Sequence, residues 1–178
     1  MLKPENTLVI AIDIQEKLTK MLKNCEEISL NCEKILKMAN ILNIQTLLTE
    51  QYPKGLGSTI PAIKGIKDFD TLEKTSFSAL QTENIFEYVK NAKKENIIIF
   101  GIEAHICLYQ TVLDLLKEKY NVYVIKDCSA SRSELNFSVS MDLMRQEGAK
   151  IATLEIVLFE LLKSSKHEKF KECQSLIK

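Results

Sequence analysis

Tryptophan is absent from this sequence, histidine occurs only twice, and neither basic nor acidic residues are in excess. The 24 lysines and arginines balance 24 aspartates and glutamates, so charge favours neither a nucleic acid nor an anionic membrane as a partner. No apolar run approaches the ~18 residues that a membrane span needs. An apolar stretch already begins at Thr7, too early to leave room for a signal sequence. We therefore expect a cytoplasmic protein with no nucleic-acid or membrane partner.

The cysteines lack the spacings typical of disulfide frameworks and zinc sites. They are five, an odd number, and none belongs to a Cys-x-x-Cys pair: Cys25, Cys32, Cys107, Cys128 and Cys173. This favours reduced thiols. With 46% hydrophobic and 27% charged residues, the 178-residue chain is typical of one globular domain. We expect its core over about 6–162 and a helical tail over 163–178.

Apolar runs of strand length alternate with segments whose apolar residues recur at helical spacing. The runs predict strands at 7–13, 44–50, 70–74, 96–102, 121–127 and 149–155. The helical segments are 27–42, 82–94, 105–119, about 131–145 and 157–165, with Thr82, Ser131 or Ser133 as candidate caps and Gly148 as a stop. Strands separated by helices form right-handed crossovers. The sequence therefore predicts an α/β fold, specifically a three-layer α/β/α Rossmann-like fold with a six-stranded parallel sheet.

Three chemically useful residues follow three different predicted strands. Ligands of such folds bind beyond the carboxyl ends of the strands, which is where Asp13, Lys74 and Cys107 lie. At the start of a helix, Cys107 is expected to ionise more readily than a free thiol. Asp13 could act as a general base. Each residue also has a plain structural reading: Asp13 as a helix cap, Lys74 as a solvated lysine and Cys107 as a small buried residue.

The ordered set of residues resembles a known family. An Asp after the first strand, Lys74 in "KTSFS" and Cys107 in "GIEAHIC" resemble the isochorismatase-like cysteine hydrolase superfamily. The stretches "TEQYPKGLG" and "EKTSFSA" are similar to its isochorismatase-domain-containing branch, and the resemblance covers Asn6 to Leu162. It implies a catalytic triad with Cys107 as nucleophile, Asp13 as base and proton shuttle, and Lys74 as the cation that holds the thiolate.

The resemblance also implies details around the nucleophile. A cis peptide is expected at Ile102–Glu103, where it would turn the Glu103 N–H toward the Cys107 N–H to form an oxyanion hole. His105 then need not be a catalytic base, although a Cys–His dyad stays open. The loop 51–66 is expected to shape a pocket for a small-molecule substrate, and the candidate substrate-binding residues are Gln51, Tyr52, Phe77, Ile102 and Ala104. Gln51 and Tyr52 could equally be structural.

No metal or other cofactor is expected. Nicotinamidases of this superfamily carry an Asp–His–His metal site after the second strand, but the corresponding segment here, "TEQYPKGLGSTIPAIKG", has no histidine. Isochorismatases, which cleave a vinyl ether, need no thiol. The presence of Cys107 therefore indicates acyl chemistry on an amide, carbamoyl or ester carbonyl through a thioester intermediate. The alternatives are a catalytically idle binding or scaffold protein and a nuclease-associated role.

Two further expectations concern association and thiol reactivity. The segment 155–178 carries Leu158, Phe159, Leu162 and Phe170, which could form an interface, so we expect a homo-oligomer, either a dimer or a tetramer. Alternatively, these residues only cover their own sheet. If Lys74 and the helix start favour the thiolate, Cys107 should also be the cysteine that iodoacetamide labels fastest near neutral pH.

Overall fold

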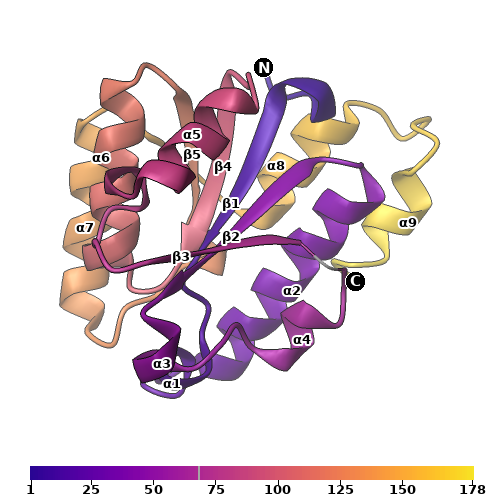
Figure 1. The fold of residues 1–178 in the computed structure, drawn as a ribbon. Coiled ribbons are helices and arrows are strands. Elements are labelled where there is room, and N and C mark those ends of the chain that lie inside the picture. The colour runs from indigo at the N-terminus through magenta and orange to yellow at the C-terminus, as the bar shows by residue number, and fades with distance from the viewer. Residues whose placement is uncertain (68) are drawn as a thin grey trace.

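A computed structural model describes residues 1–67 and 69–178 of the chain. Its parallel strands form one six-stranded sheet in the order β3-β2-β1-β4-β5-β6 (Figure 1). The strands are β1 (Thr7–Ile12), β2 (Gln45–Gln51), β3 (Asp70–Lys74), β4 (Asn96–Gly101), β5 (Asn121–Ile125) and β6 (Lys150–Ala152). The predicted α/β fold with a six-stranded parallel sheet is confirmed. The strand order reverses between β1 and β4, which opens a crevice at their carboxyl ends.

Helices cover both faces of this sheet (Figure 1). One face carries α2 (Cys25–Ile41), α4 (Pro61–Lys64), α8 (Leu154–Leu162) and α9 (Phe170–Gln174). The other carries α5 (Glu83–Asn91), α6 (Tyr109–Lys117) and α7 (Glu134–Gln146). The short helices α1 (Glu16–Thr19) and α3 (Pro53–Leu56) lie beyond the carboxyl ends of β1 and β2. Within residues 1–67 and 69–178, every helix is too short or too polar to span a bilayer.

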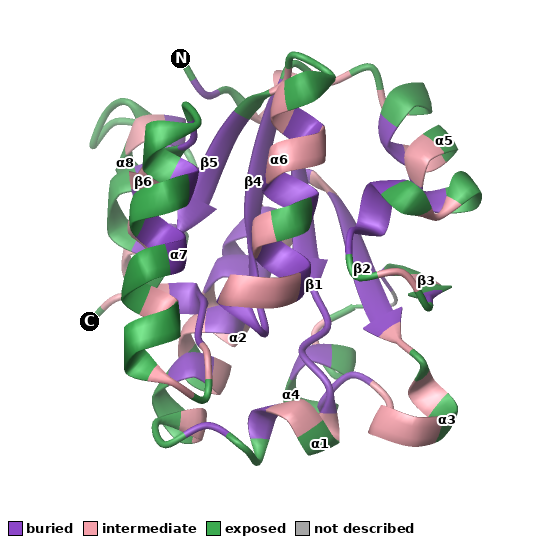
Figure 2. Ribbon diagram, turned by 90° about the vertical axis from the view of Figure 1, so that its left-hand side faces the viewer, coloured by how far each residue is buried: buried purple, intermediate pink, exposed green. Residues whose placement is uncertain are grey.

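Side-chain alternation along the strands divides the core into two parts. On β1, Leu8 and Ile10 pack toward the α5–α7 face, whereas Val9 and Ala11 pack toward the α2–α8 face. The strands β1, β2, β4 and β5 are buried over most of their length, whereas the edge strand β3 is mostly not buried and the helices keep one exposed face (Figure 2). Such continuous apolar strands are typical of a parallel sheet covered by helices.

The last strand and helix depart from the prediction. β6 has only three residues, and α8 begins at Leu154 instead of at 157. The cause is local capping: the Thr153 hydroxyl accepts a hydrogen bond from the Ile156 N–H, and Asp127 accepts one from the Leu154 N–H. These bonds satisfy N–H groups of the first helical turn and so favour helix over strand.

The other predicted caps differ in outcome. Ser133 caps α7 by accepting a hydrogen bond from the Asn136 N–H, and Gly148 follows the helix with a φ of 106°. Thr82 precedes α5 but makes no capping bond. Its hydroxyl instead lies 2.8 Å from that of Ser76, in the segment that follows β3.

The predicted interface residues of the tail are only partly available. Leu158 and Leu162 are buried in the core against the sheet, so for them the expectation of an interface role is wrong. Phe159 remains 38% exposed, and its ring lies 6.4 Å from that of Phe170. The apolar spacing of α8 serves mainly to cover its own sheet.

Candidate active site

Strand register brings the three predicted catalytic residues to one edge of the sheet. The end of β1 is paired on both sides, because Ile12 lies opposite Thr49 of β2 and Gly101 of β4. Lys74 ends β3 opposite Gln51 of β2. The side chains that follow these positions therefore meet at the crevice between β1 and β4.

Gly101 permits the close approach of β4 to β1 at this point. Its φ is 137°, and an added Cβ would lie 2.1 Å from the Ile12 carbonyl oxygen. The same carbonyl accepts a hydrogen bond from the Ile102 N–H at 2.9 Å. A side chain at 101 would therefore push apart the strand ends that carry Asp13 and the segment leading to Cys107.

Asp13 is fully buried, and its two oxygens have different surroundings. Oδ1 accepts a 2.6 Å hydrogen bond from the Thr49 hydroxyl. Oδ2 lies 2.7 Å from Lys74 Nζ in an ion pair whose side chains are both fully buried. Among the described residues, Oδ2 is also the buried side-chain nitrogen or oxygen atom that lacks a hydrogen-bond donor. Such an atom at a strand end is unusual and points to a chemical role.

Lys74 Nζ has more oxygen neighbours than N–H groups. An ammonium has three N–H donors. Lys74 Nζ donates to Gln51 Oε1 at 2.6 Å and to the carbonyl oxygens of Ser76 and Phe77 at 3.2 and 3.1 Å. Asp13 Oδ2, at 2.7 Å, is a fourth oxygen around these donors, so it shares the ammonium with neutral acceptors.

Sequence reasoning missed Thr49 and Gln15, and it named Gln51 only as a substrate-binding or structural candidate. In the structure Gln51 has a structural contact to Lys74, and its contact with a substrate stays a prediction. Gln51 is fixed by its Nε2, which donates to the Thr75 carbonyl, and by its N–H, which donates to Gln15 Oε1 at 2.7 Å. Gln15 is fully buried and also donates to the Gly57 carbonyl at 2.6 Å. The signal was available, since Gln15 and Thr49 are polar residues beside apolar strands, but their partners depend on strand register.

Cys107 lies in a π-helical turn, Ala104–Leu108, that precedes α6, so the predicted helix over 105–119 begins with a wider turn. The Leu108 N–H bonds to the Glu103 carbonyl at 3.4 Å. The Cys107 N–H therefore precedes the first closed π turn, in the region where N–H groups lack an intrahelical partner. The Cys107 carbonyl accepts from the Thr111 hydroxyl at 2.6 Å, which fixes the turn.

The expectation of a readily ionised thiol is wrong for the resting site. Cys107 is only 6% exposed, and the pKa of its thiol is raised from 9.0 to about 12, first of all by burial. The negative charge of Asp13 contributes to this rise, and the positive charge of Lys74 opposes it. Both charges thus act on the thiol, and burial outweighs the cation. We therefore expect the thiol of Cys107 to be neutral in the resting site.

The other residues around the nucleophile have structural partners. The Ile102–Glu103 peptide bond is cis, and the Glu103 carboxylate accepts from the Arg132 N–H at 3.0 Å. His105 Nδ1 lies 2.9 Å from the Ser131 hydroxyl. His105 is therefore engaged with the segment after β5.

The predicted substrate residues fall into two groups. Tyr52 and Phe77 are each 55% exposed, and both are tied to Lys74: the Tyr52 N–H donates to the Lys74 carbonyl, and the Phe77 carbonyl accepts from its ammonium. Ile102 and Ala104 are fully buried. Their contact with a substrate stays a prediction.

Metal ligands do not gather among the described residues, where no group of three His, Cys, Asp or Glu side chains could hold a metal ion. Nicotinamidases hold their metal in the segment that follows the second strand. The carboxylate that this chain offers there is Glu50, near the end of β2, and it accepts hydrogen bonds from the N–H and the hydroxyl of Thr59 at 2.6 and 2.8 Å.

Comparison with known proteins gives consistent matches over the whole chain. The model of the isochorismatase domain family matches residues 7–156. Isochorismatase domain-containing protein 2 of Xenopus laevis is 38% identical over 172 residues, covering 97% of this chain and 83% of that protein. A Caenorhabditis elegans structure described as MAR1 ribonuclease is 38% identical with a TM-score of 0.93, and the match covers 99% of this chain and 91% of that one. The Escherichia coli YcaC gene product, described as an octameric hydrolase of unknown specificity, shares the fold with a TM-score of 0.89 at 22% identity, over 99% of this chain and 94% of that one.

Proposed function

This chain belongs to the isochorismatase family and has its hydrolase fold, and we propose that it hydrolyses a small amide, carbamoyl or ester substrate through Cys107 without a metal. The observation that carries the proposal is the buried oxygen Asp13 Oδ2, which has no well-aligned hydrogen-bond donor although it lies 2.7 Å from the Lys74 ammonium. A general base needs such an available lone pair within reach of the proton that it removes.

In the first step, Asp13 Oδ2 takes the thiol proton while the sulfur of Cys107 attacks the substrate carbonyl carbon. Because the pKa of the thiol is about 12, proton transfer accompanies the attack and does not precede it. The charge of Lys74 stabilises negative charge developing on sulfur. The N–H groups of Glu103 and Cys107 form the oxyanion hole for the tetrahedral intermediate.

The intermediate then collapses. Asp13 returns the proton to the leaving nitrogen or oxygen, the carbon–leaving-group bond breaks, and a thioester to Cys107 remains. A water molecule gives its proton to Asp13 and attacks the thioester carbonyl. The carbon–sulfur bond breaks, the sulfur regains a proton from Asp13, and the acid product leaves. The base returns to its starting state in each half of the cycle.

A substrate screen tests this proposal. Amides, carbamoyl compounds and esters are assayed with the wild type, Cys107→Ala and the control Cys25→Ala. We expect Cys107→Ala to lose several orders of magnitude in kcat/KM on any true substrate, whereas Cys25→Ala keeps its activity. Intact-mass detection of an acyl adduct identifies the thioester. Turnover unchanged in Cys107→Ala would refute the mechanism, and no turnover across the screen would favour an idle binding protein.

RNA is the second candidate substrate, because the 38% identical Caenorhabditis elegans structure is described as a ribonuclease. The balanced charge of this chain does not favour it, since RNA contacts rely on basic residues. Incubating single-stranded RNA with the wild type and with Cys107→Ala tests whether RNA, and not a small amide, carbamoyl or ester compound, is the substrate. Cleavage by the wild type alone would make RNA the substrate of the same thiol.

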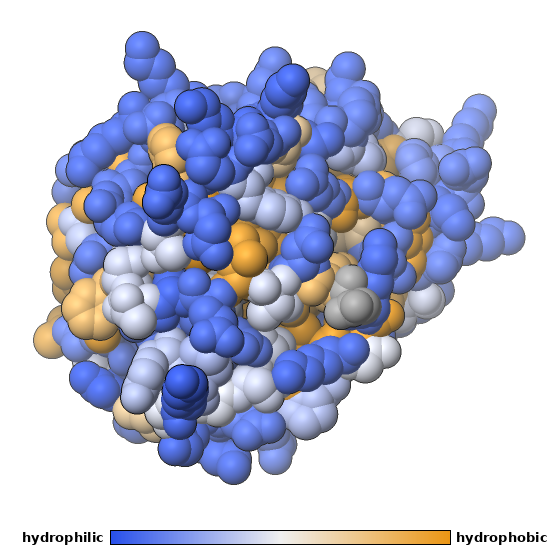
Figure 3. Space-filling model, in the orientation of Figure 1, coloured by the Kyte–Doolittle hydropathy of each residue, from blue (hydrophilic) through white to orange (hydrophobic). Residues whose placement is uncertain are grey.

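The exposed surface of α7 supports the expected homo-oligomer. Leu135, Val139 and Leu143 recur at helical spacing and are 73%, 48% and 39% exposed. Figure 3 shows apolar side chains along the edge of the molecule formed by α7, at the left. An apolar stripe on an outer helix is a typical protein–protein interface. We propose that copies of the chain associate through it.

A further inference from the structure

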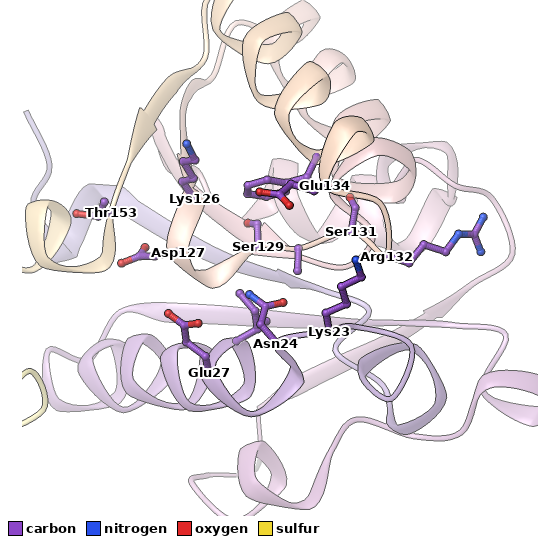
Figure 4. A pocket seen from close by; sticks show the side chains of 13 residues that line it. Lys23, Asn24, Glu27, Lys126, Asp127, Ser129, Ser131, Arg132, Glu134 and Thr153 are labelled. Carbon is purple, nitrogen blue, oxygen red and sulfur yellow. The ribbon is translucent and has the colours of Figure 1, made fainter.

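A cavity lies beyond the carboxyl ends of β5 and β6, and the triad does not line it. Its volume is about 470 Å³, in the range of small-molecule sites. Figure 4 shows its two walls: the start of α2 below, and the segment after β5 with the start of α7 above. Asp13, Lys74 and Cys107 are not among the residues that line it. The cavity is therefore a separate place where a ligand can bind.

Hydrogen bonds to residues 103–105 hold the upper wall of the cavity in place. The Ala130 carbonyl accepts a 2.8 Å hydrogen bond from the Ala104 N–H, and the Ser131 hydroxyl lies 2.9 Å from His105 Nδ1. The Arg132 N–H donates to the Glu103 carboxylate. These contacts hold the wall without closing the cavity, so a ligand meets a largely preformed surface.

Charged side chains of both signs line this cavity: Glu27, Asp127 and Glu134 are acidic, and Lys23, Lys126 and Arg132 are basic. Glu27 and Asp127 lie at one end, and the Lys23 ammonium rises toward the upper wall at the other, with the Asn24 amide between them (Figure 4). Among the described residues, neither Lys23 nor Glu27 takes part in an ion pair within 4.0 Å. Their charges remain available to a ligand.

The rest of the lining combines the polar side chains of Ser129, Ser131 and Thr153 with an apolar part. Ile28 and Ala130 are 4% and 5% exposed, and the half-buried ring of Phe137 adds a third apolar surface. A simple anion would face the carboxylates of Glu27 and Asp127, and a simple cation would face Lys23. A ligand that suits all of these groups carries both charges and an apolar part.

We propose that this cavity binds a small zwitterion of the amino-acid class with an apolar side chain. The ammonium of the ligand faces Glu27 and Asp127, and its carboxylate faces Lys23 and the Asn24 amide. The apolar side chain packs on Ile28 and the ring of Phe137. Charge-assisted hydrogen bonds at both ends give orientation, and the apolar contact gives selectivity among amino acids.

Binding of L-leucine and L-phenylalanine to the full chain, by calorimetry and thermal shift, tests the proposal. Leucinamide lacks the carboxylate and 4-methylpentanoate lacks the amine, so both should bind about tenfold more weakly than leucine or worse. Lys23→Gln and Glu27→Gln should weaken leucine binding by a similar factor. Lys20→Gln and Glu26→Gln are matched controls, because these exposed residues do not line the cavity.

Two results would overturn this proposal. One is the absence of saturable binding of both amino acids to the wild type at millimolar concentrations. The other is leucine binding that Lys23→Gln and Glu27→Gln leave unchanged, which would place the ligand elsewhere. The test needs no turnover, so its outcome is independent of the hydrolase proposal.

Discussion

The protonation state of Cys107 can be tested by the rate at which its thiol is alkylated. Substitutions of Asp13 and Lys74 should change this rate in opposite directions. With a pKa of about 12, roughly one thiol in ten thousand is ionised at pH 8, against roughly one in ten at the ordinary value of 9.0. Alkylation by iodoacetamide requires the thiolate. Cys107 should therefore react about a thousandfold more slowly at pH 8 than an exposed thiol. Its rate should keep rising about tenfold per pH unit through pH 10.

The two charged neighbours should shift this profile in opposite directions. Asp13→Asn removes a negative charge that opposes the thiolate, so the pKa of the thiol falls and alkylation at pH 8 accelerates by about tenfold or more. Lys74→Met removes the favourable positive charge and slows it. Turnover behaves differently, since Asp13→Asn also removes the proton acceptor. Faster alkylation combined with lost turnover distinguishes a proton shuttle from a structural cap.

Peptide mass mapping after timed labelling supplies the rates, and partly exposed Cys25 serves as the internal reference. The structure reverses the labelling order expected from the sequence, so Cys25 should react ahead of Cys107 at pH 8. A wild-type rate for Cys107 that levels off below pH 8 would show a preformed thiolate. Shifts of the same sign in Asp13→Asn and Lys74→Met would contradict the assigned charges.

Three further predictions concern stability and assembly. Lys74→Met leaves the buried carboxylate of Asp13 without its cation. Urea titrations should show a free energy of unfolding lower by about 3–5 kcal/mol. The double variant Lys74→Met with Asp13→Asn should recover part of that loss. Gly101→Ala should abolish soluble expression, because its Cβ would clash with the Ile12 carbonyl. Gly65→Ala is the control, because Gly65 has a φ of −73° and its Cβ would come no closer than 3.5 Å to the Pro61 carbonyl oxygen; it should shift the melting temperature by only a few degrees. Leu135→Glu, on the exposed stripe of α7, should convert an oligomer to a monomer in light scattering, and a monomeric wild type would refute the proposed interface.

The order of elements could be predicted from the sequence because most strands are short apolar runs between helical patterns. β3 was predicted with its observed bounds, Asp70–Lys74, even though most of its residues are not buried. The end of the sheet was less accessible to sequence reasoning. The residues 153–155 read as the continuation of an apolar run, and only the capping bonds of Thr153 and Asp127 place them in a helix.

The positions of Asp13, Lys74 and Cys107 could be predicted for a topological reason, since the carboxyl ends of parallel strands share one edge. Their environment could not. Whether Thr49 donates to Asp13, or Gln51 to a neighbour, depends on register between strands that the sequence does not specify. The thiol pKa likewise depends on burial, because desolvation outweighs the favourable charge of Lys74.

The Lys74 ammonium has three N–H donors and four oxygen neighbours. Gln51 Oε1 and the carbonyls of Ser76 and Phe77 lie at 2.6, 3.2 and 3.1 Å, and Asp13 Oδ2 lies at 2.7 Å. Asp13 Oδ2 therefore shares the ammonium with three neutral acceptors. A carboxylate oxygen accepts more than one hydrogen bond, so this contact leaves a lone pair for the thiol proton. This favours Asp13 as the proton acceptor and assigns Lys74 to electrostatic stabilisation. Gln51→Leu should disturb this arrangement, because it removes one neutral acceptor and strengthens the contact between the ammonium and Asp13.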